Sequence, residues 1–344
     1  MNSSIGQLVL HAPNIHSGGG EVLLRNILAI NDLPVRWAQL DARSRDNCQL
    51  PQCTVKHFVS RSVFSRIFAE WRLHRTATTS DVVLCFHGLP PLFPTRAKVV
   101  VFIQNRLLIE SNSLAEYPLN IRLRLEMERL WCRLFQSRCS RYIVQTPSMA
   151  KSLTRWLRSE IHVSVLPFVP ATLNSSTFTT ARIQFDFVFI ASGEAHKNHD
   201  NLLLAWRLLA EAGLRPSLAL TVDALSHPRL ASEIERERNH HSLNIVNLGK
   251  VASADIPALY KSSSALIFPS KVESFGLPLI EATQMGLPVL ASELDYVRDV
   301  IEPVETFNPE SPVSIARAVR RFLKNPDPIT PVGTAEEFLA EVLR

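Results

Sequence analysis

The sequence predicts an α/β protein built from two Rossmann-like domains, each with a doubly wound parallel sheet. Short apolar segments rich in β-branched residues alternate with helical segments along both halves of the 344-residue chain. A polar segment rich in serine and threonine, residues 170–182, separates the two halves. Ligands bind to such sheets beyond the carboxyl ends of the strands, so we expect the site residues in the loops that follow strands.

The apolar segments are typical of strands that are buried on both faces of a parallel sheet. In the first half we expect strands at 7–11, 81–86, 98–103 and 141–144, and helices at 21–30, 62–77 and 121–136. In the second half we expect strands at 185–191, 217–222, 244–247, 265–269 and 288–291, and helices at 198–212, 229–239, 254–261, 279–285 and 312–323. The polar segment makes 1–169 the first domain, 170–182 the linker and 183–330 the second domain. Residues 331–344 are expected to form a helix that packs back toward the first domain.

The composition excludes several classes of protein. Hydrophobic residues make up 46% of the chain and charged residues 20%, which fits buried cores rather than disorder. Five cysteines without zinc-like spacing indicate reduced thiols rather than disulfides or a metal site. The sequence has neither an apolar run of about eighteen residues, as a membrane span requires, nor the pattern of a secretory signal at its start. We therefore expect a cytoplasmic protein.

The charge is distributed unevenly between the two halves. Residues 1–170 contain 21 Lys and Arg against 11 Asp and Glu, a balance of +10, whereas the remainder has 16 against 21, a balance of −5. Such asymmetry marks either a solvated basic face or a surface for an anionic partner, such as lipid headgroups or a phosphorylated acceptor. Because no nucleic-acid-binding motif accompanies the charge, we expect no nucleic-acid partner.

Three glycines, Gly18, Gly19 and Gly20, follow the first strand and open a helix. Their backbone N–H groups can approach an anion closely, and the positive end of the helix dipole favours one. The pattern is not the GxGxxG fingerprint of dinucleotide-binding enzymes. A plain tight turn is the alternative interpretation.

A second candidate segment, Ser192 to His199, lies between a strong strand and a long helix. Lys197 is expected near the N-terminal end of that helix, where a cation is unfavourable. A bound diphosphate would supply the missing negative charge and accept hydrogen bonds from the ammonium group. An ordinary surface lysine is the alternative.

The third and most specific segment contains Glu273 and Glu281. Pro278 suits the first turn of a helix and Gly286 its end, so Glu273 is expected in the preceding loop and Glu281 on the first turn. Backbone N–H groups near Phe275, Gly276 and Leu277 can face a phosphate. The carboxylate of Glu281 can accept two hydrogen bonds from a ribose diol, while Glu273 can reach a sugar ring. Stabilisation of the helix dipole is the alternative role for Glu281.

The spacing of Glu273 and Glu281 within FPSKVESFGLPLIEATQMGLPVLAS, residues 268–292, resembles the signature of the retaining GT-B glycosyltransferases of family 4. Other segments resemble the same family in the same order along the chain. These are VQTPSMAKSL, VSVLPF, IASGEAHKNHDNLLLAW, NLGKV and FNP. The resemblance covers nearly the whole chain and is densest from 187 to 309. It implies the GT-B fold, with an acceptor-side first domain and a nucleotide-sugar-binding second domain.

The resemblance also implies roles for individual residues. Lys197, with Gly193 and Asn198 beside it, corresponds to the family's diphosphate-binding segment. Glu281 corresponds to the ribose-binding carboxylate and Glu273 to the carboxylate at the donor sugar. The glycines at 18–20 correspond to the loop of the first domain near the phosphates, and residues 274–277 complete the expected donor-binding set.

Two positions depart from the family pattern. Glu194 follows Gly193 where an arginine is common, and His196, Asn198 and His199 are candidates to replace part of that contact. Gln104-Asn105-Arg106 stands where many relatives have a histidine of the first domain. His87 is a candidate to occupy the neighbouring space as a catalytic residue, with a purely structural histidine as the alternative.

As a function, the resemblance implies transfer of a hexosyl-type sugar, with retention, from a UDP- or GDP-sugar to a glycan or lipid-linked glycan. Such transfer belongs to bacterial surface polysaccharide synthesis. No Asp-x-Asp motif in a strong context is present, so we expect no metal and no cofactor other than the nucleotide-sugar co-substrate. The alternatives are a GT-B nucleotide-sugar 2-epimerase and a catalytically inactive nucleotide-sugar-binding subunit.

Residues 121–141 form a basic amphipathic segment. Arg122, Arg129 and Arg133 are expected on one helix face, opposite an apolar face that includes Met127 and Leu130. Such a helix either lies on an anionic membrane surface or packs on the sheet. In the first case the protein would be peripheral on the inner face of the plasma membrane, and a lipid-linked sugar would be the natural acceptor.

Overall fold

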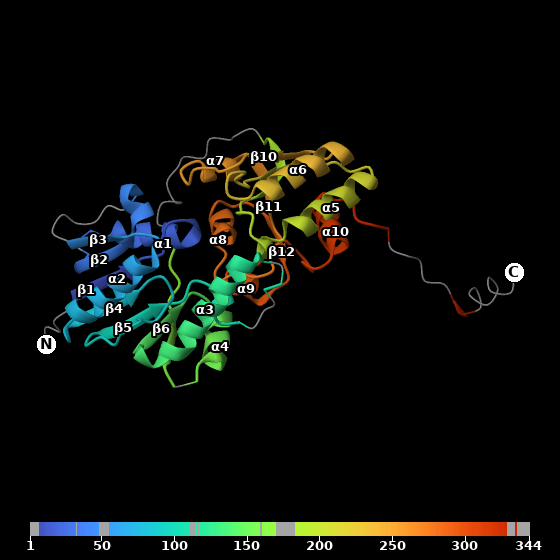
Figure 1. Ribbon diagram of the computed structural model, residues 1–344. Coiled ribbons are helices and arrows are strands. Elements are labelled where there is room, and N and C mark those ends of the chain that lie inside the picture. Colours follow the sequence, from blue (N-terminus) through green and yellow to red (C-terminus); the bar gives the residue numbers. More distant parts are fainter. Residues whose placement is uncertain are drawn as a thin grey trace.

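The computed structural model describes residues 7–31, 33–47, 55–110, 114–115, 117–158, 160–169, 183–328 and 334–335. It contains two parallel β-sheets, each covered by helices on both faces, and the two domains lie side by side (Figure 1). The first sheet has seven strands in the order β3-β2-β1-β4-β5-β6-β7, and the second has six in the order β10-β9-β8-β11-β12-β13. The predicted α/β class with two doubly wound Rossmann-like domains is therefore confirmed.

The first sheet is formed by segments between residues 7 and 165. Its strands are β1 (Gln7–Ala12), β2 (Val35–Asp41), β3 (Val55–Val59), β4 (Asp81–Cys85), β5 (Lys98–Phe102), β6 (Arg141–Val144) and β7 (His162–Val165). The helices are α1 (Gly18–Leu28), α2 (Val63–Thr76), α3 (Leu119–Phe135) and α4 (Pro147–Trp156), with short 3-10 turns η1 (Ala42–Asn47), η2 (Arg106–Leu108) and η3 (Gln136–Arg138).

Two apolar clusters show which helices cover which face of this sheet. Leu23 and Leu24 of α1 belong to one cluster, together with Leu10 and Leu40 of the sheet. Residues of α2, α3 and α4, among them Leu73, Leu125 and Met149, belong to the other cluster. The helical part of the basic amphipathic segment, α3, therefore does pack on the sheet, through Leu125.

The second domain repeats the pattern with β8 (Phe185–Phe189), β9 (Leu218–Leu220), β10 (Ile245–Asn247), β11 (Ser263–Phe268), β12 (Val289–Ser292) and β13 (Glu305–Phe307). Its helices are α5 (His199–Glu211), α6 (Pro228–His241), α7 (Ile256–Lys261), α8 (Leu277–Gln284), α9 (Asp295–Arg298) and α10 (Pro312–Phe322), and a 3-10 turn, η5 (Ala195–Lys197), precedes α5. A single large apolar cluster fills this domain, with Trp206, Phe187 and Phe268 among its fully buried side chains.

The two domains touch through the segment between β11 and α8. The side chains of Phe275 and Leu277 are buried in an apolar cluster of the first domain. The backbone N–H of Arg106 donates to Oγ of Ser274 at 2.9 Å. Nearby, the N–H of Ser148 donates to Oδ2 of Asp299 at 2.8 Å. The segment that was predicted to bind the donor therefore also docks one domain against the other.

Several predictions fall at the limits of the described residues. The linker at 170–182 lies outside them, as does the predicted C-terminal helix at 331–344 apart from residues 334–335, so the domain boundaries stay predictions. Cys85, Cys132 and Cys139 are buried free thiols, whereas Cys48 and Cys53 lie outside the described residues. Across the part of the chain that the structure describes, no helix combines the length and the apolar character needed to span a bilayer.

Candidate functional site

The predicted donor-binding residues lie beyond the carboxyl ends of β1, β8 and β11, in the loops there and near the start of the helices that follow. Lys197 is the last residue of the η5 turn, and only Asn198 separates it from α5. Glu273 lies in the loop between β11 and α8. Parallel strands end at the same edge of their sheet, which brings these two loops together although they are 76 residues apart.

Lys197 and Glu273 form a close ion pair. Nζ of Lys197 donates to Oε1 of Glu273 at 2.6 Å, and the two side chains are 18% and 12% exposed. The ammonium group is therefore already neutralised by a carboxylate of its own domain. A phosphate that binds Lys197 has to compete with Glu273 for it.

The loop after β11 ends in the predicted helix, α8. Gly276 is its N-cap with φ of 75°, a left-handed conformation that favours glycine, and Pro278 lies in its first turn. Glu281 is the fifth residue of α8 and so begins the second turn, one position beyond the first turn that we predicted. The error arose because the helix begins at Leu277, earlier than the predicted residue 279.

Glu281 is held by a tyrosine that the sequence analysis did not single out. The hydroxyl of Tyr260, on α7, donates to Oε2 of Glu281 at 3.0 Å. Burial raises the pKa of Glu281, and the hydrogen bond from Tyr260 opposes this only in part. The carboxylate thus has a fixed orientation, and its ionised form is destabilised by burial. Hydrogen bonds from the hydroxyl groups of a bound ligand would offset this destabilisation.

The glycines of the first domain face this helix. Gly18 begins α1 with φ of 67°, and a Cβ atom on Gly19 would lie 3.2 Å from Cδ1 of Leu277, the first residue of α8. The N-terminal ends of α1 and α8 therefore meet where the domains touch. Within the described chain, no side chain caps either end by a hydrogen bond. Two positive helix ends that meet in this way make a site suited to an anion.

Glu194, which departs from the family pattern in the sequence analysis, stands near Lys197. Its carboxylate accepts a hydrogen bond from the hydroxyl of Ser192. Burial acts to raise the pKa of Glu194, but the bond from Ser192 and the positive charge of Lys197 outweigh it and lower the pKa. The carboxylate is consequently ionised at neutral pH. Gly193 lies against His227, whose Cγ would be 2.6 Å from a Cβ atom at that position.

The other polar residues of this segment hold the loop in place. The side-chain amide of Asn198 donates to the backbone carbonyls of Pro269 at 3.0 Å and Pro309 at 2.8 Å. Asn198 also has φ of 65°, which turns the chain sharply from η5 into α5. These bonds indicate a structural role, and its contact with a donor stays a prediction. His196 bonds through Nδ1 to the hydroxyl of Tyr117 in the first domain, at 2.9 Å.

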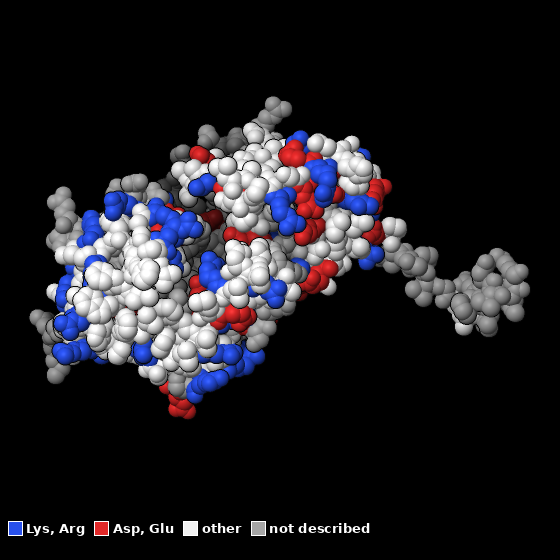
Figure 2. All heavy atoms as spheres, viewed as in Figure 1, with Lys and Arg blue, Asp and Glu red and all other residues white. Residues whose placement is uncertain are grey.

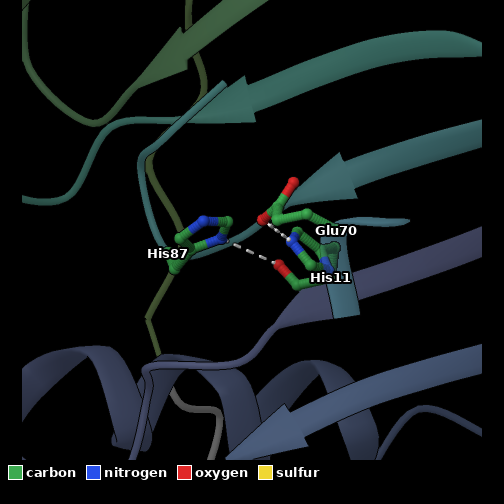
Figure 3. A group of neighbouring side chains, drawn as sticks. All are labelled: His11, Glu70 and His87. Carbon is green, nitrogen blue, oxygen red and sulfur yellow. Dashed lines mark hydrogen bonds and ion pairs between the residues drawn. The ribbon is translucent and has the colours of Figure 1, made fainter. Parts of the chain in front are cut away.

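His87 follows β4 in the first domain and belongs to a cluster with His11 and Glu70 (Figure 3). Nε2 of His11 and Oε1 of Glu70 are 2.8 Å apart, and both side chains are buried. Nδ1 of His87 lies 3.2 Å from the backbone oxygen of His11, and the two imidazole rings are edge to face at 4.8 Å. The second carboxylate oxygen of Glu70 accepts the backbone N–H of Leu92 at 2.9 Å.

The surroundings of His87 decide what it can do. Burial, with the nearby His11, lowers the pKa of His87 to about 3, so the ring is neutral at physiological pH. A neutral ring that donates from Nδ1 to the carbonyl of His11 presents Nε2 as an acceptor. His87 can therefore accept a hydrogen bond but cannot act as a general acid near pH 7. Its predicted catalytic role stays a prediction.

The same three side chains are the group that could hold a metal ion, among the residues that the structure describes. Their ligand atoms lie within 4.8 Å of one another. Nε2 of His11 is already bonded to Glu70 without an ion, whereas the buried Nδ1 of His11 finds no hydrogen-bond partner among the described residues. The absence of a metal from the reaction stays a prediction.

Gln104, the other departure from the family pattern, follows β5 in the first domain. Its Nε2 donates to the backbone oxygen of Phe86 at 2.6 Å, and its Oε1 lies 3.1 Å from the position of a Cβ on Gly20. This buried Oε1 finds no hydrogen-bond partner among the described residues. Gln104 thus joins the loop before His87 to the glycines of α1. In the sequence, Gln104 could be recognised as a candidate because it directly follows a predicted strand.

Residues 179–336 match the family described as Glycosyl transferases group 1. The serotype-specific mannosyltransferase WbdA of Escherichia coli is 33% identical over 146 residues, which cover 40% of this chain and 17% of WbdA. The O-antigen chain mannosyltransferase B of Escherichia coli is 32% identical over 116 residues, 33% of this chain and 30% of that protein. The chain therefore matches well under half the length of these relatives.

Solved structures share the fold over most of the chain. HepE of Anabaena, crystallised in complex with UDP and glucose, has a TM-score of 0.66 at 15% identity, covering 93% of this chain and 90% of HepE. Sucrose-phosphate synthase from Thermosynechococcus elongatus has a TM-score of 0.67 at 17% identity, with the same coverage. The chain thus has the GT-B arrangement of two Rossmann-like domains, and its second domain resembles the glycosyl transferases group 1.

Proposed function

We propose that the protein transfers a hexosyl-type sugar, with retention, from a UDP- or GDP-sugar to a glycan or lipid-linked glycan. The observation that carries the proposal is the meeting of two helix N-termini, at Gly19 and Leu277, beside the ion pair of Lys197 and Glu273. An anion with two phosphates suits such a site, because both helix ends and the ammonium group favour negative charge.

The proposed donor pose uses each of these groups once. The diphosphate lies between the N-termini of α1 and α8 and takes the ammonium group of Lys197 from Glu273. The ribose diol donates two hydrogen bonds to Glu281, whose orientation Tyr260 fixes at 3.0 Å. Glu273, released from Lys197, then orients hydroxyls of the donor sugar.

The proposed chemistry is attack on the same face from which the phosphate leaves. An acceptor hydroxyl oxygen bonds to the anomeric carbon while the bond from that carbon to the β-phosphate oxygen breaks. The hydroxyl proton passes to the departing phosphate oxygen, so that the products are the glycoside and the nucleoside diphosphate. Lys197 and the helix ends stabilise the charge that develops on the phosphate, an effect worth several kcal/mol. We propose that no metal ion takes part.

Sequence relatives support a mannosyl group as the sugar and a surface polysaccharide as the product. The relatives WbdA, O-antigen chain mannosyltransferase B and O-antigen chain mannosyltransferase RfbU of Salmonella typhimurium are all named as mannosyltransferases. Lipid-linked acceptors for such polymers are assembled at the membrane. We therefore propose that the protein works in the cytoplasm, at the inner face of the plasma membrane.

A thermal-shift screen of UDP-, GDP- and ADP-sugars against the full chain tests the donor, because a ligand that binds the folded state raises its melting temperature. Transfer is then measured with the best donor and a lipid-linked glycan. Lys197→Ala, Glu273→Ala and Glu281→Ala should each lower transfer by at least a hundredfold, whereas Lys151→Ala, an exposed change on α4, should leave it unchanged. Wild-type transfer by Lys197→Ala and Glu273→Ala would overturn the proposal, and isomerised donor without acceptor would indicate the epimerase.

One observation favours a second candidate, a nucleotide-sugar-binding subunit without transfer activity. Glu194 is ionised beside Lys197, so that this ammonium group has two carboxylates near it, Glu194 and Glu273. This negative charge opposes the dianionic leaving group. Under this alternative the wild type binds the donor but neither transfers nor hydrolyses it, and Glu194→Arg gains activity. Transfer by the wild type excludes it.

A further inference from the structure

Two helices of the first domain leave an unusual number of large apolar side chains in solvent. Ten of the 21 exposed large hydrophobic residues in the described chain lie on α2 and α3. They are Val63, Phe64, Ile67, Phe68 and Trp71 on α2, and Leu119, Leu123, Met127, Leu130 and Leu134 on α3. Isolated exposed apolar residues are ordinary, but a concentration of this kind marks an interaction surface.

The exposed residues of α3 form a stripe. At 3.6 residues per turn, positions 119, 123, 127, 130 and 134 span about 80° of the helix circumference. Leu125 and Cys132, which are buried against the sheet, lie on the opposite side of the helix. α3 therefore has one apolar face for the core and a second for solvent, and packing on the sheet does not account for the second.

α2 and α3 are neighbours and form one surface. Arg66 of α2 interacts electrostatically with Glu128 of α3. The segment after β4 lies between the two helices, since Nε1 of Trp131 donates to the backbone oxygen of Pro90 at 2.7 Å and His74 contacts that of Pro94 at 2.5 Å. Figure 2 views this side of the molecule, where uncharged side chains cover much of α2 and α3 and Lys and Arg gather at the edges.

The charges around this surface are strongly positive. Residues 61–76 and 119–138 together contain nine arginines, four and five respectively, against three glutamates, one and two. Glu70 is buried in the cluster with His11, so it does not offset the exposed charge. On α3, exposed Arg122 and Arg133 flank the apolar stripe on one side and Arg124 flanks it on the other. An apolar centre with an arginine rim matches the headgroup region of an anionic bilayer.

We infer that the face formed by α2 and α3 docks onto an anionic lipid bilayer. Phe, Trp, Leu and Met side chains enter the boundary between headgroups and acyl chains, and the arginines pair with lipid phosphates. The chain is anchored by this face without any segment crossing the membrane.

The orientation that results suits the proposed function. Each helix follows a parallel strand, so it begins at the carboxyl edge of the sheet, where the site residues lie. Near the start of α2, Arg66 donates to Oδ1 of Asn14 at 2.7 Å, in the loop before Gly18. On α3, Arg129 donates to the backbone oxygen of Leu107 at 2.8 Å, in the turn after β5. A docked protein would hold this edge close to the bilayer, where a lipid-linked acceptor lies; this benefit rests on the proposed function, but the binding itself does not.

The inference is tested by flotation of the full chain with vesicles of phosphatidylcholine, with and without phosphatidylglycerol. The wild type should float with the anionic vesicles only. The triple variant Phe64→Ser/Leu123→Gln/Met127→Gln should lose at least tenfold in apparent affinity, because these side chains are 85%, 58% and 71% exposed and have little else to contact. Arg122→Gln/Arg133→Gln should weaken binding about fivefold for each arginine removed.

A matched control lies on the second domain. Leu225→Gln/Leu248→Gln/Val304→Gln removes three exposed apolar side chains away from this face and should leave flotation unchanged. All variants should keep the wild-type melting temperature and the thermal shift with the donor. If the wild type floats with anionic vesicles but no nucleotide sugar raises its melting temperature, the result contradicts the proposed function and leaves the membrane docking intact.

Failure of the wild type to float, or equal flotation of the triple variant, would overturn the inference. A dimer in sedimentation that the triple variant loses, without flotation, would assign the face to a second copy of the chain instead.

Discussion

Replacing Glu273 with glutamine should separate binding of the nucleotide from transfer of the sugar. Lys197 is held by Glu273 at 2.6 Å, and a diphosphate has to take the ammonium group from that carboxylate. Glutamine keeps the shape of the side chain but removes the charge. We therefore expect Glu273→Gln to bind UDP or GDP, which lack the transferred sugar, more tightly than the wild type does, and to transfer almost no sugar.

The magnitude follows from the burial of the pair. The side chains are 18% and 12% exposed, so solvent screens the pair little, and a hydrogen bond between charged groups contributes about 1.5–3 kcal/mol. We take the lower end of that range because the amide oxygen of glutamine still accepts a hydrogen bond from Lys197. Since about 1.4 kcal/mol corresponds to a factor of ten, we expect about a tenfold lower Kd for the nucleoside diphosphate. Lys197→Met removes the cation itself and leaves the carboxylate, so it should raise the Kd about a hundredfold.

Isothermal titration calorimetry of UDP and GDP against the three proteins measures both effects. Glu211→Gln is the matched control, because Glu211 also pairs with a basic residue, Arg207 at 2.9 Å, but is 55% exposed at the far end of α5. It should bind as the wild type does. If Glu273→Gln weakens nucleotide binding as much as Lys197→Met does, the diphosphate does not compete with Glu273 and the reasoning is refuted.

Three further predictions concern stability and metal dependence. Burial raises the pKa of Glu281 above 4.5, so the folded protein favours the protonated carboxyl group. The stability that this group contributes is therefore lost as the pH rises through its pKa in the folded state. Glu281→Gln should consequently melt at a higher temperature than the wild type at pH 8 but not at pH 4. Gly193→Ala should destabilise the protein by about 1–3 kcal/mol in denaturant titrations, because its Cβ would lie 2.6 Å from Cγ and 2.8 Å from Cβ of His227. Adding His227→Gly, which removes both atoms, should recover part of the loss. Sugar transfer should be unchanged after dialysis against EDTA. His11→Ala should lower the free energy of unfolding by about 3 kcal/mol, with or without chelator, because it leaves Glu70 buried without its partner.

Much of the fold could be predicted because its strands are apolar runs. The nine expected strands and eight expected helices all occur, most within two residues of the predicted ends. In contrast, β2 was missed because it contains Gln39 and Asp41, polar residues that are nevertheless buried. Their partners explain this: Gln39 donates to the backbone oxygen of Ala69 at 3.0 Å, and Asp41 pairs with Arg43 at 2.7 Å. A contact between α2 and β2 cannot be seen in a hydrophobicity pattern.

The remaining missed elements are short or of mixed character. The strands β3, β7 and β13 and the helices α4 and α9 were also not predicted. β7 has partly exposed residues along its length, and β13 has three residues, so neither makes a clear apolar run. Such segments become strands because a parallel neighbour already offers hydrogen bonds, which is a property of the sheet rather than of the segment.

The site residues could be predicted where a chemically suited side chain lies near the start of a helix. Lys197 and Glu273 lie in loops that lead into helices and Glu281 lies near the start of one, and such junctions are visible in a sequence. The residues that support them are not. Tyr260 and Glu70 lie within helices, and only the fold shows that the one holds Glu281 and the other holds His11.

The segment from Ser274 to Leu277 has two tasks, and this links donor binding to the contact between the domains. Its side chains dock on the first domain, since Phe275 and Leu277 are buried in an apolar cluster there and Ser274 bonds to Arg106. Its backbone begins α8, whose N–H groups are available to an anion. If the first domain moved away, Leu277 would leave Gly19 and the two helix ends would no longer face one site. A diphosphate that binds both ends therefore favours the arrangement in which the domains touch, and the glycines of the first domain take part in donor binding for this reason.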